Sequence, residues 1–332
     1  MFLRDCRADF WTRIARASLC GALVVTVFVA QAQPAYPARA VRLILPFPPG
    51  GSTDLLGRAL AERLAEQLRQ PVVPENRPGA GGNVGAEAAA RSAPDGYTLV
   101  LCAPSLAISA SLYRKLNYDP LRDLAPIALV ATIPNLLVVH PAVPARSLAE
   151  LAQHARENPG KLNFGTGGAG TSNHLASDMF RMLTRTDIVQ VPYKGAETAM
   201  LALLGGQVQM VVIGPPAAAP HVKSGKLRAL AVLGRERLAD FPEVQTAAES
   251  GMPGFEVDTW YGVLAPAGVP REIVVRLSAE FAKMMQAGEM RERLAALGVQ
   301  PLTSTPEQFG EFLKAEVAKW AAVVKESGAR AD

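Results

Sequence analysis

Aromatic residues make up only 6% of this chain of 332 residues, and no run of basic residues with interleaved aromatics occurs in it. Nucleic-acid binding therefore has little support. Long apolar runs are missing too: after Ala30, no apolar segment approaches the roughly 20 residues that cross a membrane. With 49% hydrophobic and 19% charged residues, the chain is typical of a globular protein of about two domains.

The N-terminal segment differs from the rest. Residues 19–30 form an apolar run of about twelve residues, too short for a membrane anchor. Four arginines precede the run: Arg4, Arg7, Arg13 and Arg16. This order predicts a secretory signal peptide, residues 1–32, with small residues at Ala30 and Ala32 before the cleavage point. We therefore expect a soluble, exported protein located in the periplasm.

Cysteine is scarce, with three residues in the whole chain. Cys6 and Cys20 would leave with the signal peptide, so only Cys102 remains and no intramolecular disulfide can form. Cys102 ends an apolar run, and we expect it to be a buried strand residue. The signal peptide carries four arginines and two aspartates, so its removal lowers the net charge from +4 to +2.

Strand-like and helix-like segments alternate along the chain, which is typical of an α/β fold with a largely parallel sheet. The first unit is a strand at 41–47 followed by a helix at 54–69, whose leucines recur every four residues. Similar units follow it, and a pair of strands is broken at Pro134. Residues 235–254 look irregular.

Three helices are predicted near the C-terminus, at 270–286, 289–297 and 306–325. Thr305 and Gln308 would form a capping box at the start of the last helix. Its apolar face is predicted to be core packing and consists of Phe309, Phe312, Val317, Trp320 and Val324.

The segment "PFPPGGSTD", residues 46–54, joins the first strand to the first helix. A helix start leaves about four N–H groups unpaired and attracts anions without a basic side chain. Gly50 and Gly51 allow close approach of a ligand, and Ser52 and Thr53 add hydroxyl donors. In the competing interpretation, Ser52, Thr53 or Asp54 only caps the helix.

The segment "FGTGGAGTSNH", residues 164–174, repeats this arrangement. It contains G-x-G-x-x-G, but no acidic residue ends the next strand as a nicotinamide site requires. His174 has three interpretations: packing or capping, ligand contact, and catalysis with Ser172. Tyr193 and Lys194 end the following strand, where α/β sheets place their ligands, or Lys194 is a solvated surface charge.

Other chemistries find no motif in the sequence. Neither Gly-Lys pair is followed by Ser or Thr, so a phosphate-binding loop is excluded, and no G-x-S-x-G occurs. The four histidines show no metal-ligand spacing. We predict no metal, no cofactor and no enzymatic activity. What remains is a pair of helix starts that can hold a small carboxylate from both sides.

From about Tyr36 to Lys325, the chain resembles the Bug (TctC-like) family, the extracytoplasmic solute-binding receptors of tripartite tricarboxylate transporters. The resemblance rests on "YPARAVRLILPFPPGGSTDLLGRALAERL", "VVPENRPGAGGNVGAEAAARSAPDGYTL", "LYRKLNYDPLRDLAPIALVA", "LNFGTGGAGTSNHLASDMF", "VPYKGAETAMLALLGGQV", "HVKSGKLRALAV" and "WYGVLAPAGVPREIV".

The resemblance implies a type II periplasmic-binding-protein fold of two α/β domains with a ligand cleft between them. Domain 1 would comprise residues 36–135 and 258–332, and domain 2 residues 136–257. The family's pattern places ligand contacts on both glycine segments and on two further positions. The residues implied are Phe47, Gly50, Gly51, Ser52, Thr53, Asp54, Ser105, Thr166, Gly167, Gly168, Thr171, His174 and Tyr193.

The implied function is capture of a small mono- or dicarboxylate and its delivery, by a monomer, to membrane permease subunits. A ligand-sensing receptor for a membrane sensor kinase is the alternative, and an exported hydrolase using Ser172 and His174 is a remote one. Many family members carry acidic residues where this chain has Gln209 and Ile213. Since an acid there would suit an amino group, we expect plain carboxylates rather than amino acids.

Overall fold

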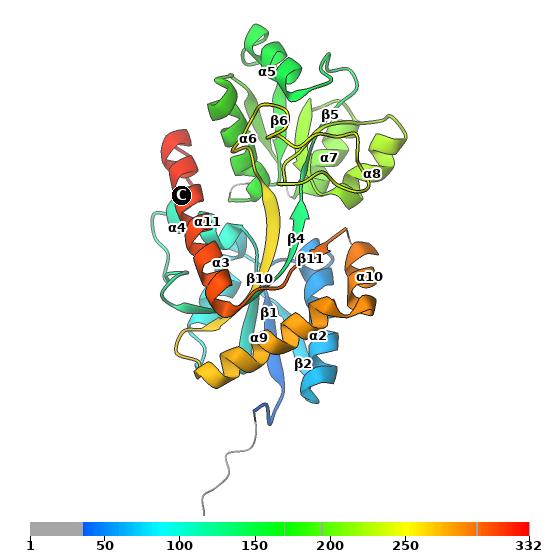
Figure 1. The fold of residues 1–332 in the computed structure, drawn as a ribbon. Helices are drawn as coiled ribbons and strands as arrows, with labels where there is room; N and C mark the ends of the chain where they lie inside the picture. Colours follow the sequence, from blue (N-terminus) through cyan, green and yellow to red (C-terminus); the bar gives the residue numbers. More distant parts are fainter. Residues whose placement is uncertain (1–35, 169, 194, 297, 332) are drawn as a thin grey trace, which may run out of the picture. The chain divides into compact units, whose positions relative to one another are not determined.

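The computed structural model describes residues 36–168, 170–193, 195–296 and 298–331. The predicted signal peptide and Lys194 lie outside them. Residues 39–332 form one compact unit that contains two β-sheets flanked by helices (Figure 1). Among the described helices, none is both long and apolar enough to span a lipid bilayer.

The first sheet has the strand order β11-β4-β10-β3-β1-β2. Its strands are β1 (Val41–Leu45), β2 (Val72–Asn76), β3 (Thr98–Cys102), β4 (Leu124–Pro134), β10 (Asp258–Pro266) and β11 (Gln300–Pro301). β1 pairs in parallel with β2 and β3, whereas β10 is antiparallel to β3 and β4, and β11 is antiparallel to β4. The residues of β1 and β3 are almost all buried, as expected for strands covered on both faces.

The second sheet has the order β7-β6-β8-β5-β9. Its strands are β5 (Leu136–Val139), β6 (Asn163–Thr166), β7 (Val189–Pro192), β8 (Met210–Ile213) and β9 (Arg228–Val232). β6 is parallel to β7 and β8, and β5 is antiparallel to β8 and β9. The prediction of a largely parallel sheet is therefore wrong, because both sheets are mixed. Strand direction depends on how the chain crosses between the sheets, which hydrophobic periodicity does not encode.

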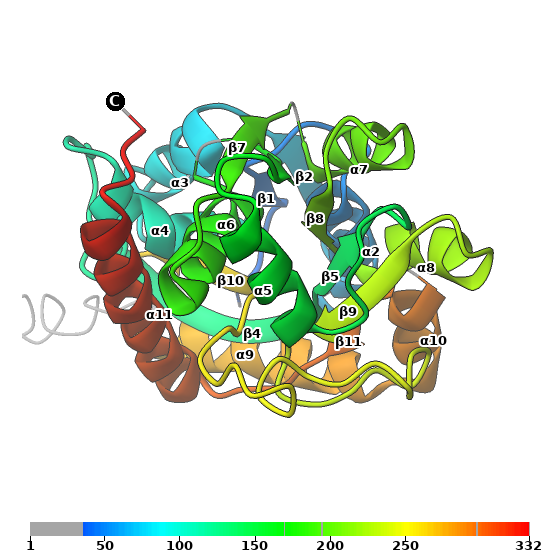
Figure 2. The same ribbon diagram turned by 90° about the horizontal axis from the view of Figure 1, so that it is seen from above.

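Helices cover both faces of each sheet (Figures 1 and 2). The helices around the first sheet are α2 (Ser52–Leu68), the 3-10 turn η1 (Ala80–Gly82), α3 (Asn83–Ala90), α4 (Ser105–Leu112), α9 (Arg271–Gln286), α10 (Gly288–Ala296) and α11 (Pro306–Ser327). Those around the second are α5 (Leu148–Glu157), α6 (Ser172–Thr184), α7 (Ala196–Leu204) and α8 (Pro215–Lys223). The three predicted C-terminal helices and the helix after β1 are confirmed within a few residues.

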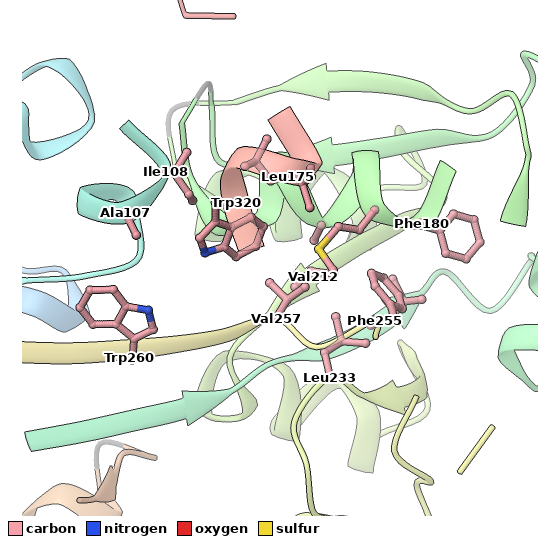
Figure 3. Packing of buried hydrophobic residues seen from close by; sticks show 14 of the residues in the cluster. Ala107, Ile108, Leu175, Phe180, Val212, Leu233, Phe255, Val257, Trp260 and Trp320 are labelled. Atoms are coloured by element: carbon pink, nitrogen blue, oxygen red, sulfur yellow. The ribbon is translucent and has the colours of Figure 1, made fainter. Parts of the chain in front are cut away.

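The C-terminal helix α11 connects the helices of the two sheets, because it packs against both α4 and α6. The predicted capping box of Thr305 and Gln308 is confirmed. Trp320 is fully buried and belongs to one apolar cluster with side chains from both sheets' helices, among them Ile108 and Leu175 (Figure 3). The indole N–H groups of Trp260 and Trp320 both donate to Glu316 Oε2 at 2.9 Å. The aromatic face of this helix is therefore core, as predicted.

The chain crosses between the sheets at two places. It passes from β4 to β5 through Asn135, and it returns between β9 and β10 through the irregular segment that the sequence predicts. The Asn135 amide joins the two crossings by donating to Val257 O at 2.7 Å and Thr259 Oγ1 at 3.1 Å. These are the predicted domain boundaries, and the division into two domains stays a prediction.

Candidate functional site

The first loop, residues 46–51, connects β1 to α2. Gly51 is the residue at which α2 is capped, and no side chain accepts a hydrogen bond there. Leu55 N–H makes the first helical hydrogen bond, to Gly51 O at 3.0 Å. The competing interpretation, in which Ser52, Thr53 or Asp54 serves only as a cap, therefore does not describe this helix start. Its leading N–H groups are left for another acceptor.

Asp54 ties the first loop to its neighbours. Its carboxylate accepts from Gly50 N–H at 3.0 Å, from the Arg58 guanidinium at 3.0 Å and from the Asn76 amide at 2.9 Å. The same Asn76 amide also donates to Phe47 O at 3.1 Å. The hydrogen bond from Arg58, helped by those from Gly50 and Asn76, lowers the pKa of Asp54 to about 2 although burial opposes it. Asp54 is 4% exposed, so it stabilises the loop from the protein interior.

The two glycines of the first loop play different parts. Gly50 has φ +87°, which favours glycine, and its N–H is already used by Asp54. Gly51 has φ −81°, which any residue can adopt. A Cβ added at Gly51 would meet only Pro48 O, at 4.0 Å, and one added at Gly50 would meet nothing within 4 Å. The loop therefore presents open space in front of the helix start.

Side chains around the first loop bring further predicted residues together. Gly82 lies against Phe47 and Ser105, since a Cβ placed on it would come within 3.4 Å of the Phe47 ring and 3.5 Å of Ser105 Oγ. Burial raises the pKa of Tyr261 to about 12, although hydrogen bonds from the Thr53 and Ser52 side chains lower it. The first loop and the side chains around it thus form a first neighbourhood, which contains Phe47, Ser52, Thr53 and Ser105.

The second loop, residues 167–171, connects β6 to α6. Thr171 caps α6: its Oγ1 accepts from His174 N–H at 3.3 Å and donates to Gly168 O at 2.7 Å. The hydroxyl proton of Thr171 is therefore engaged within the loop. Thr166, at the end of β6, is 1% exposed, and its hydroxyl has no hydrogen-bond partner among the described residues.

Two glycines hold the second loop close to the residues that follow β7. Gly168 has φ +100°, and a Cβ on it would lie 3.3 Å from Tyr193 O. Tyr193 N–H donates to Thr166 O at 2.9 Å. A Cβ on Gly167 would lie 3.1 Å from Asn173 Oδ1 and 3.2 Å from Ala196 N. The second loop, Tyr193 and the start of α7 therefore form a second neighbourhood.

Glu197 relates the two neighbourhoods. It lies in the first turn of α7, beside the second loop, and its carboxylate adds to the raised pKa of Tyr261, whose hydroxyl meets Ser52 and Thr53. No hydrogen bond among the described residues joins the first loop directly to the second. The two neighbourhoods are thus related through the charge of Glu197 and the Tyr261 hydroxyl.

Other features of the described residues lie away from these loops. Surface cavities of about 390 to 450 Å³ are lined by none of the predicted site residues. No group of three or more metal-ligating side chains occurs in the part of the chain that the structure describes. Gln209 accepts from Asn163 N–H at the start of β6, and Ile213 is 3% exposed in the apolar cluster beneath α7 and α8. Neither side chain therefore offers a polar contact to the two loops.

Sequence reasoning missed three residues that shape the two neighbourhoods. Asn76 ends β2 directly beside Leu45, so the rule that ligands lie at the carboxyl ends of parallel strands could have found it. Asn173 holds the start of α6 by donating to Val212 O at 3.0 Å. Tyr261 lies inside an antiparallel strand, and nothing in its sequence context signals its position.

Comparison with known proteins adds an independent observation. Residues 56–329 match the sequence profile of the family described as tripartite tricarboxylate transporter family receptor. Protein BugT of Bordetella pertussis is 41% identical over 316 residues, which cover 92% of this chain and 97% of BugT.

Solved structures of similar proteins also cover most of the chain. An R. palustris protein solved with adipate is 35% identical with a TM-score of 0.79, and the match covers 89% of this chain and 99% of that one. The periplasmic binding protein BugD is 34% identical with a TM-score of 0.77, with 89% and 99% covered. The type II binding-protein fold predicted from the sequence is thereby confirmed.

Proposed function

Because the chain belongs to the tripartite tricarboxylate transporter receptor family, we propose that it captures a small organic carboxylate in the periplasm and delivers it to membrane permease subunits. This is a family of receptors, not of enzymes. The chemistry required of the protein is binding alone. The predicted signal peptide supplies the route to the periplasm.

The observation that carries the proposal is that two helices each begin at a glycine-containing loop directly after a parallel strand. These helices are α2, after the first loop, and α6, after the second. N–H groups and partial positive charge at such starts suit a carboxylate. In this arrangement, the first loop holds one carboxylate group of the ligand through the backbone N–H groups at the start of α2. The described residues of the second loop contribute contacts to the remainder of the ligand.

Plain mono- or dicarboxylates fit this site better than amino acids. Gln209 and Ile213 offer no negative charge to an ammonium group, because one bonds to the backbone of β6 and the other is buried among apolar side chains. Glu197 is an acidic side chain in the first turn of α7, beside the second loop, and we expect an amino group to bind there. The adipate held by the R. palustris relative has the chemistry that we propose for this ligand.

The test is isothermal titration calorimetry of the mature protein with adipate, succinate, malate, acetate, glutamate and aspartate. We expect at least one plain acid to bind more tightly than either amino acid. Tight binding of glutamate or aspartate that is lost in Glu197→Gln would contradict the plain-acid specificity. Failure of every acid to bind would contradict the receptor function itself. Native mass spectrometry of protein purified from its host would identify a ligand retained through purification.

A further inference from the structure

A buried pair of ionisable side chains lies in α6 directly behind the second loop, and carboxylate capture as described above does not use it. His174 Nε2 and Asp178 Oδ2 are 4.0 Å apart, and the two side chains are 14% and 4% exposed. They stand one helical turn apart, on the buried side of the helix. His174 belongs to the first turn of α6, and its own N–H donates to the capping Thr171.

Each member of this pair has a buried polar atom without a partner. His174 Nδ1 and Asp178 Oδ2 make no hydrogen bond with any described residue. The other carboxylate oxygen, Asp178 Oδ1, accepts from Gln190 Nε2 at 2.6 Å and from the Arg181 guanidinium at 3.4 Å. An unpaired buried carboxylate oxygen is costly, and a proton bound by either member of the pair would lower that cost.

Few other charges act on the pair. The strands that pack against α6 are β6, β7 and β8, and they contain no ionisable side chain. α11 also packs against α6, but none of its lysines or glutamates shifts the pKa of either group. Among the described residues, the charges that act on the pair are therefore those of its own two members and of Arg181, which partly offsets Asp178.

The environment opposes charge on either member. Burial lowers the pKa of His174, while Asp178 raises it; burial raises the pKa of Asp178, while His174 and Arg181 lower it. The two groups titrate as a unit, so one proton changes the pair's charge from minus one to zero, whichever atom carries it. This negative charge lies behind the helix start at which the ligand is proposed to bind.

We propose that the His174 and Asp178 pair takes up a proton when the carboxylate binds, so that the protein holds its ligand more tightly in mildly acidic than in alkaline solution. The proposal rests on the proposed function, since the second loop must be part of the ligand site. A bound anion and a charged pair would repel each other through a poorly screened interior. Protonation of the pair removes that repulsion. We expect an effect of roughly five- to tenfold in affinity.

The experiment is calorimetry with the tightest-binding acid of the panel above, at pH 5.5 and pH 8.0, in two buffers of different ionisation enthalpy. The wild-type protein should bind five- to tenfold more tightly at pH 5.5 and should take up a fraction of a proton per ligand at intermediate pH. Asp178→Asn removes the negative charge, so its affinity at pH 8.0 should rise toward the value at pH 5.5. His174→Gln should lose most of the pH dependence.

The matched control is His221→Gln, which changes a histidine in the last turn of α8 and should behave as the wild type. A second readout needs no ligand: the NMR titration of the His174 ring should move to lower pH in Asp178→Asn. Ligand binding without proton uptake and with equal affinity at both pH values would contradict the proton linkage and leave the receptor function intact. An unchanged His174 titration in Asp178→Asn would also contradict the coupling between the two side chains. Failure of every acid to bind would contradict the receptor function.

Discussion

The first and second loops are placed alike, each between a parallel strand and a helix, but their polar groups are satisfied to different degrees. Around the first loop, the buried Asp54 carboxylate accepts from Gly50, Arg58 and Asn76. Around the second, buried polar atoms of Thr166, His174 and Asp178 have no partner among the described residues. The two halves of the proposed site thus differ in how completely the folded chain has organised them.

The two loops represent two kinds of anion site, one organised before the ligand binds and one that gains its hydrogen bonds when the ligand binds. A loop that is already held by hydrogen bonds from its supporting side chains loses little conformational freedom when the ligand arrives. Buried groups without partners are costly in the free protein, and they gain most from a ligand or a proton that satisfies them. We infer that the first loop provides a fixed template and that the second loop makes binding responsive to the ligand and to pH.

Gly51→Val would test the template most severely. The backbone of Gly51 accepts any residue, so the variant should fold, but the valine side chain would fill the open space in front of α2. We expect carboxylate affinity to fall by about 100-fold, or about 2.7 kcal/mol. Calorimetry measures the loss of affinity, and thermal unfolding confirms that the fold is retained.

Gly288→Val is the matched control for this variant. Gly288 lies at the start of α10, and a Cβ added there also meets nothing within 4 Å. This variant should bind the ligand as the wild type does. If Gly51→Val bound the same acid with unchanged affinity, the first loop would not be the site, and the comparison between the loops would lose its functional meaning.

Asp54→Ala would break the order of the first loop without entering the ligand space. Its removal leaves Arg58, Asn76 and Gly50 N–H without their shared acceptor, so we expect the free energy of unfolding to fall by about 2 kcal/mol. Urea unfolding at pH 7 measures it. Glu87→Ala in α3 is the control, since it removes a more exposed carboxylate from an arginine at the same helical spacing and should cost under about 1 kcal/mol.

The pKa of Asp54 also predicts how the stability of the protein changes with pH. The folded-state pKa of Asp54 is about 2, below its ordinary value of 3.8, so its stabilisation is complete above pH 3.8 and is lost as the pH falls toward 2. Asp54→Asn should therefore flatten the decline in stability between pH 4 and pH 2. An acid limb as steep as that of the wild type would show that Asp54 is not the group responsible.

Much of the fold follows from local patterns in the sequence. The helix after β1 follows from leucines at every fourth residue, and the start of α11 follows from Thr305, Pro306 and Gln308. Cys102 is 2% exposed at the end of β3, as its apolar context predicts. The sequence does not predict α4, because the apolar residues of Ser105–Leu112 show almost no preference for one side of the helix.

The candidate site was predictable where it depends on a single segment and not where it depends on packing. Both glycine loops are local features, and each lies between a strand and a helix as predicted. The roles of Asn76, Tyr261 and Glu197 arise from which strands and helices become neighbours. The antiparallel course of β10, which brings Tyr261 to the first loop, leaves no mark in the residue pattern.

A pair of hydroxyl deletions gives the smallest and sharpest test of the comparison between the loops. Thr53→Val removes a hydroxyl that hydrogen-bonds to the buried Tyr261, so the free energy of unfolding should fall by about 1 kcal/mol. Thr166→Val has the same change in shape, but it removes a hydroxyl that has no partner in the described structure, so stability should stay within about 0.5 kcal/mol or increase. Urea unfolding of both variants measures the difference. If the Thr166 hydroxyl meets the ligand, Thr166→Val should still weaken carboxylate binding about fivefold. Equal losses of stability in the two variants would show that both loops are organised to the same degree before the ligand binds.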